Sequence, residues 1–97
     1  LGYALTQYNL ALAYISLAQK ENIGTNLSRA ISSLACALAI WDEAGSLKAR
    51  SAAAHLIAAR EVLGIDQFQL ILESQLKKSP CGVDPSEVLN LMRKWAE

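Results

Sequence analysis

The side chains that could perform chemistry are few, and their spacing does not pair them. His55 is the only histidine, and no motif supplies the carboxylate or thiol that a catalytic imidazole works with. Cys81 lies in a Pro–Cys–Gly turn, but the sequence shows no base that would activate its thiol. Two cysteines and one histidine this far apart do not form a zinc site. We therefore predict a protein that is not an enzyme, with no catalytic residue, no metal and no cofactor.

Sites for phosphate or nucleic acid are not indicated either. The five glycines stand singly, so the glycine-rich loop that cradles phosphates is missing. Lys77–Lys78 and Arg93–Lys94 could form a small basic face. However, nine Lys and Arg balance nine Asp and Glu, and no recognition-helix pattern is present. We expect these charges, like Asp42–Glu43, to be solvated surface, and we expect no nucleic-acid partner.

The two cysteines, Cys36 and Cys81, are too few for a disulfide scaffold. Cys36 lies within a helical pattern, whereas Cys81 lies in a turn. We interpret both as free thiols in a reducing compartment, which predicts a cytoplasmic protein.

The elements that position these side chains are predicted to be helices. The chain has 97 residues, enough for one small domain, and 53 % of them are apolar, which excludes a disordered segment. Ala and Leu contribute 16 residues each and Val only three, so the composition excludes an all-β fold. The sequence begins at Leu1 without Met, which we interpret as the sign of a fragment or a processed chain.

Turn signals divide the chain into five helical segments. Thr25 or Asn26 can cap the second helix, Ser46 can cap the third, and Asp66 begins a capping-box pattern for the fourth. Residues 84–87, Asp-Pro-Ser-Glu, give the clearest start signal, for the fifth. Because the connections are short, we expect successive helices to be antiparallel neighbours. The predicted helices cover approximately residues 3–20, 25–45, 47–63, 66–77 and 85–97.

The first helix is unusual because residues 1–19 carry no charge. The stretch is too polar for a membrane span, which needs about 20 predominantly apolar residues, since it contains Gln7, Asn9, Ser16 and Gln19. No basic residue precedes Lys20, as one would in a signal peptide. We therefore expect no membrane partner and interpret this helix as buried on more than one side.

The apolar residues of the first helix fall into two stripes. A surface helix that packs on one side needs only one stripe. The first stripe contains Tyr3, Leu10, Tyr14 and Leu17. The second stripe contains Leu5, Tyr8, Leu12 and Ile15. Two stripes predict a second partner, either a neighbouring helix or a ligand.

Residues 3–45 resemble a tetratricopeptide helix pair of the long-period type found in bacterial proteins. The string Tyr-Ala-Leu-Thr-Gln-Tyr-Asn-Leu-Ala-Leu-Ala-Tyr, residues 3–14, carries the resemblance. The family positions with matching residues are Leu10, Ala11 and Tyr14 in the first helix and Ala30, Leu34 and Ala37 in the second. The resemblance implies a right-handed superhelical stack of antiparallel helix pairs, here of about five helices.

The resemblance weakens along the chain. Gln7 stands where the family has Trp, as in the long-period subgroup, and Asp42 replaces the terminal Pro. Residues 46–78 could be a degenerate second pair, and residues 79–97 a C-terminal capping helix. We therefore expect residues 1–97 to be a single domain, with the pair 1–45 at its start, and a fragment of a longer array.

In the resembled family, the first helix of each pair lines a groove that holds a partner peptide. Carried over to this chain, the partner-binding residues are Leu5, Tyr8, Asn9, Leu12 and Ile15. Apolar and aromatic residues stand where related arrays use Lys and Asn to bind acidic chain ends. The resemblance thus implies a groove for an apolar or amphipathic helix, and we expect a non-catalytic protein–protein interaction module.

Three alternatives stay open. The second stripe can pack against the last helices of this chain or against a preceding repeat. The first helix can pair with a second copy, which would make the domain a homo-oligomerisation module. The domain can also be the regulatory arm of a larger signalling enzyme. By resemblance, arrays of this type are often attached to peptidase or nucleotide-hydrolysing domains.

Overall fold

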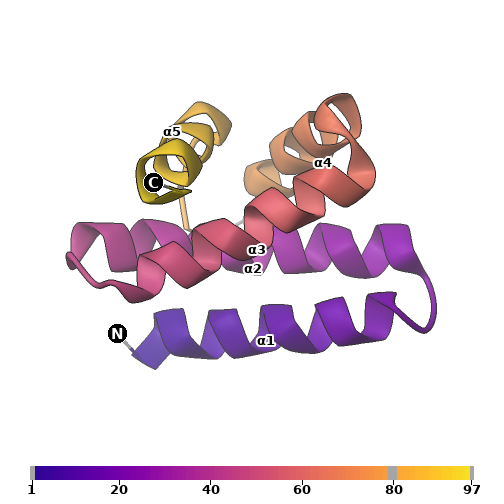
Figure 1. Cartoon of the computed structure of the whole chain (residues 1–97), viewed down its shortest axis with the longest axis horizontal. Helices are drawn as coiled ribbons and strands as arrows, with labels where there is room; N and C mark the ends of the chain where they lie inside the picture. The colour runs from indigo at the N-terminus through magenta and orange to yellow at the C-terminus, as the bar shows by residue number, and fades with distance from the viewer. Residues whose placement is uncertain (1, 79–80, 97) are drawn as a thin grey trace.

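The computed structural model of the chain describes residues 2–78 and 81–96. Within these residues every regular element is a helix, so the predicted all-α class is confirmed. The helices are α1 (Gly2–Ala18), α2 (Ile23–Glu43), α3 (Lys48–Leu63), α4 (Ile65–Lys78) and α5 (Pro85–Ala96), shown in Figure 1.

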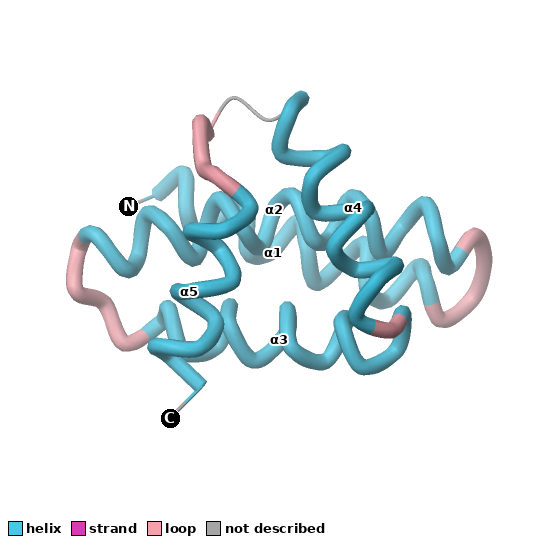
Figure 2. Tube along the Cα trace, turned by 90° about the horizontal axis from the view of Figure 1, so that it is seen from above, coloured by secondary structure: helices cyan, strands magenta, loops and turns pink. Residues whose placement is uncertain are grey.

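The five helices lie in three layers. α1 forms one outer layer, α2 and α3 lie side by side in the middle, and α4 and α5 cross over the middle layer on the side away from α1 (Figures 1 and 2). α2 packs against each of the other four helices and is therefore the centre of the fold. α1 packs chiefly along α2 and leaves much of its own surface uncovered.

The central position of α2 follows from its sequence. No charged residue stands between Arg29 and Asp42, so this stretch can be buried on every side. Leu34, Leu38 and Trp41 are almost inaccessible to solvent. Phe68 from α4 and Met92 from α5 complete the same core.

Small residues let α1 approach α2 closely. The buried residues of α1 are Ala4, Ala11 and Ala18, each seven residues after the last. On α2, Arg29 lies over the ring of Tyr14 and Trp41 packs against Tyr8. The face of α2 between Arg29 and Trp41 is therefore turned to α1. That face carries Ala30 and Ala37, also seven apart and buried.

The helix starts were predicted with mixed success. α5 begins at Pro85, as the Asp-Pro-Ser-Glu signal predicts, and the hydroxyl of Ser46 accepts a hydrogen bond from the backbone N–H of Lys48 at the start of α3 (3.2 Å). The start predicted for α2 was wrong, because the helix already begins at Ile23, after Asn22 in the left-handed conformation (φ 47°). The Asn26 side chain lies inside the helix and donates to the carbonyl of Glu21 (3.0 Å).

The turn from α3 to α4 departs from the expected antiparallel arrangement. Gly64 alone joins the two helices, with a positive φ of 90° that glycine adopts without strain. α4 then runs across α3 instead of beside it (Figure 2). The direction of α4 follows from the burial of Phe68 and Leu72, which lie on its inner face and pack over the middle layer. The superhelical stacking of a tetratricopeptide array stays a prediction.

The prediction of two free thiols was wrong, because Cys36 and Cys81 form a disulfide. Their Cα atoms lie 5.8 Å apart, within the normal range for a disulfide. The bond ties the segment between α4 and α5 to the middle of α2, across 45 residues of sequence. Cys36 and Cys81 come together only when α4 and α5 fold back over α2. The spacing of the two cysteines in the sequence does not indicate this arrangement.

One helix among the described residues is long and apolar enough to cross a membrane, judged by length and composition alone. It is α2, and its most apolar window has a mean hydropathy of 1.3. In this structure 56 % of that window is buried, as expected of the core helix of the fold, and core helices pass the same test.

Candidate functional site

The structure divides the predicted partner-binding residues of α1 into two groups. Leu5 and Asn9 are exposed and Leu12 is half-buried. Tyr8 and Ile15 pack against the core instead. Tyr8 packs against Trp41 on α2 and His55 on α3, not against the last helices that the packing alternative named. The other three residues remain accessible to solvent.

Tyr8 joins three helices through its ring. Its centroid lies 5.3 Å from that of Trp41 on α2 and 5.7 Å from that of His55 on α3, both in tilted geometry. Such aromatic contacts favour a fixed mutual orientation of the rings. The only histidine of the chain thus packs beside Tyr8, and Tyr8 connects α1 with both α2 and α3.

A hollow lies beside Leu5 at the N-terminal end of α1. Trp41 from α2, Ala44 just after α2 and Lys48 at the start of α3 line it, and its volume is about 340 Å³. Leu5 and Asn9 stand one helical turn apart, and Leu12 follows within two turns. The hollow therefore combines the apolar side chains of Leu5 and Trp41 with Lys48, and Asn9 and Leu12 follow along the same side of α1 outside its lining.

The first stripe of α1 is also exposed, although the sequence-based site did not include it. Tyr3, Leu10 and Leu17, spaced by seven residues, each expose more than two-fifths of their surface. Tyr14 is partly covered, with the guanidinium of Arg29 located 5.7 Å from the centre of its ring. The two-stripe pattern was the signal that could have identified these residues.

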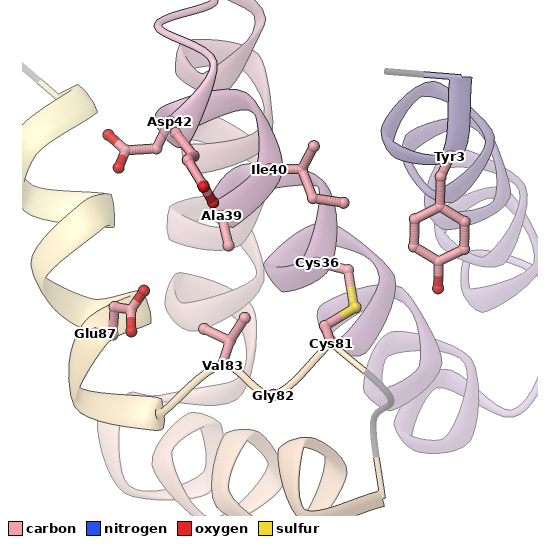
Figure 3. Close-up of a pocket in the computed structure, with 10 residues that line it drawn as sticks. Tyr3, Cys36, Ala39, Ile40, Asp42, Cys81, Gly82, Val83 and Glu87 are labelled. Carbon is pink, nitrogen blue, oxygen red and sulfur yellow. A yellow bond between two sulfur atoms is a disulfide. The ribbon is translucent and has the colours of Figure 1, made fainter.

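A second groove begins at Tyr3 and runs to the disulfide (Figure 3). Its volume is about 730 Å³, and Ile40 and Val83 give it an apolar lining next to the Cys36–Cys81 bond. Glu43 and Glu87 add carboxylates to its lining. An alkyl chain with a cationic end would match this composition, but the groove is open and its acidic side chains lie at the surface.

Asp42, which also lines this groove, holds the end of α5 in place. Its Oδ1 accepts hydrogen bonds from Nζ of Lys94 (2.7 Å) and from Nε1 of Trp95 (2.9 Å). The hydrogen bond from Lys94 is the main cause that lowers the pKa of Asp42 below its ordinary value of 3.8; partial burial works against it, and Trp95 adds to the lowering. The expectation that Asp42 is solvated surface was therefore wrong, because it ties α2 to α5.

Among the described residues, no three His, Cys, Asp or Glu side chains lie close enough together to hold a metal ion. His55 stands against Tyr8, and the Cys81 sulfur is bonded to Cys36. The uncharged helix α1 lies at the surface with a hollow along either flank.

The fold and its surfaces define a small all-helical domain with an exposed apolar outer helix. No protein-family model matches the chain, and neither a curated protein nor a solved structure matches it.

Proposed function

We propose that this domain is a non-catalytic protein-interaction module that binds an apolar or amphipathic helix of a partner through α1. The observation that carries the proposal is the exposure of α1. The helix has no charged residue, packs chiefly along α2, and still exposes 43 % of Leu5. An uncharged apolar helix at the edge of a small domain favours burial against a further element.

In the proposed complex, the partner helix lies along the surface between α1 and α3. Leu5 and Leu12 contact its apolar face, and Tyr8 with Trp41 forms the floor beneath. The amide of Asn9, at the edge, can hydrogen-bond a polar group of the partner. This is the helix-in-groove mode of recognition, in which a few central apolar contacts supply most of the binding energy.

The experiment is site-specific photo-crosslinking in cells that make the protein. A photoreactive residue replaces Leu5 in one variant and Leu70, an exposed leucine on α4 (62 %), in the matched control. We expect one protein to be captured from position 5 and not from position 70. Equal capture from both positions, or capture from neither, would refute the proposal.

Self-association is the second candidate, because an uncharged helix can pair with its own copy without charge repulsion. Light scattering after size exclusion, at two concentrations about 20-fold apart, separates the candidates. A mass that rises with concentration toward that of a dimer supports self-association. A monomeric mass at both concentrations excludes self-association in that range and leaves the heterologous partner to the crosslinking experiment.

We further propose that α1 and α2 form a tetratricopeptide-type pair, supported by the burial of the three small residues of the resemblance, Ala11, Ala30 and Ala37. The cytoplasmic location stays a prediction. Its basis was the pair of free thiols, and the disulfide removes that basis, because disulfides are rare in reducing compartments.

A further inference from the structure

A hollow between α3, α4 and α5 is separate from the surfaces of α1. Its volume is about 290 Å³, close to the lower end of the range for small-molecule sites. Each of the three helices contributes residues at helical spacing: Ile57 and Arg60 from α3, Phe68 from α4, and Leu89, Met92 and Arg93 from α5.

The floor of this hollow is apolar and firmly held. Phe68 and Met92 are almost fully buried, and both belong to the main core. Ile57 and Leu89 are half-buried and pack against that core. A ligand that enters would therefore meet a preformed apolar surface and need not open the fold.

Charge at the hollow has one sign. Arg60 and Arg93 line it and no carboxylate does. Over residues 2–78 and 81–96, neither arginine makes an ion pair. Asp66, in the first turn of α4, is exposed and does not line the hollow. Arg60 is half-buried and Arg93 is exposed. Two positive groups that line one hollow favour an anion there over a cation.

The ends of α3 and α5 offer a competing explanation. Each arginine stands in the last turn of its helix, where a positive charge interacts favourably with the helix dipole. That role accounts for the charge of each arginine, but it does not require both to line one apolar hollow.

We propose that this hollow binds a small amphipathic carboxylate, with its apolar chain against the half-buried Ile57 and Leu89 and its carboxylate held by Arg60 and Arg93. Guanidinium groups match carboxylates because they donate two parallel hydrogen bonds. The proposal is independent of the partner-binding role of α1.

The test is a titration of the whole ¹⁵N-labelled domain with octanoate, followed by amide chemical shifts in NMR spectra. Octylammonium, with the same chain and opposite charge, and acetate, with the same head and no long chain, are the control ligands. We expect octanoate to shift the amides of Phe68, Leu89 and Met92 in a saturable manner. Octylammonium and acetate should leave them at least fivefold less affected at equal concentration.

The variant Arg60→Gln with Arg93→Gln is then compared with Arg50→Gln, which changes an exposed arginine of α3 outside the hollow. We expect at least a fivefold weaker affinity for octanoate in the double variant and no change in Arg50→Gln. Equal shifts with octylammonium would overturn the proposal. A double variant that unfolds at a lower temperature but binds octanoate as the wild type does would also overturn it. The two arginines would then only stabilise the C-terminal ends of their helices.

Discussion

Removing the Cys36–Cys81 disulfide should cost this small domain a large part of its stability. The bond closes a loop of 45 residues between the centre of α2 and the segment before α5. Chain-entropy arguments give about 3 kcal/mol for a 15-residue loop and about 4.7 kcal/mol for a 100-residue loop, which places this bond near 4 kcal/mol. Measured values usually fall below that figure, so we expect a loss of about 2–4 kcal/mol.

The loss should be visible in urea denaturation and in thermal unfolding. A domain of this size loses roughly 5 °C of Tm for each kcal/mol, so the expected shift is about 10–20 °C. The wild type is compared with and without dithiothreitol, beside a Cys36→Ala, Cys81→Ala double variant. The reduced wild type and the double variant should unfold at similar, lower denaturant concentrations, and reductant should not affect the double variant.

Two results would refute this reasoning. One is a wild type whose unfolding midpoint is the same with and without reductant. The other is two alkylatable thiols in the native protein before any reductant is added. Either result would mean that α4 and α5 are held over α2 by packing alone.

Three further predictions concern single side chains. Asp42→Asn should destabilise the fold by about 1 kcal/mol at pH 7, a small value because Lys94 is 60 % exposed. The pKa of Asp42 is lowered in the folded state, so the stability that its carboxylate contributes is present above pH 3.8 and is lost as the pH falls through the folded-state pKa. Denaturation at pH 7 and at pH 2.5 should therefore show a smaller difference in stability between variant and wild type in acid. Phe68→Ala, at the fully buried centre of α4, should cost about 3–5 kcal/mol in urea denaturation, and a cost below 1 kcal/mol would contradict its place in the core. Tyr8→Asp should lower the Tm through the lost contacts with Trp41, whereas Leu5→Asp should leave the Tm within about 2 °C; equal losses would contradict the division of the predicted site.

The local features of the fold could be predicted from the sequence. The helical composition and the Asp-Pro-Ser-Glu start of α5 depend on residues that are neighbours in the chain, and both predictions are confirmed. The start of α2 was misplaced because Asn22 takes up the left-handed conformation. Thr25 and Asn26, the residues with good capping side chains, therefore lie within the helix.

The long-range features could not be predicted. The Cys36–Cys81 bond joins residues 45 positions apart, and the Asp42–Lys94 contact joins residues 52 positions apart. Both depend on the crossing of α4 and α5 over α2, which no periodicity in the sequence reports. Tyr8, which packs against Trp41 and His55, could not be distinguished from Leu5, which remains exposed, because both belong to one stripe of α1.

We propose that α1 is a docking surface for a partner helix. Isothermal titration of the wild type, Leu5→Glu and Leu70→Glu with the helix of the protein captured from position 5 tests this claim most directly. We predict at least tenfold weaker binding, about 1.4 kcal/mol, for Leu5→Glu and unchanged affinity for Leu70→Glu, with circular dichroism showing both variants folded. Unchanged affinity for Leu5→Glu, or the same loss for both variants, would contradict it.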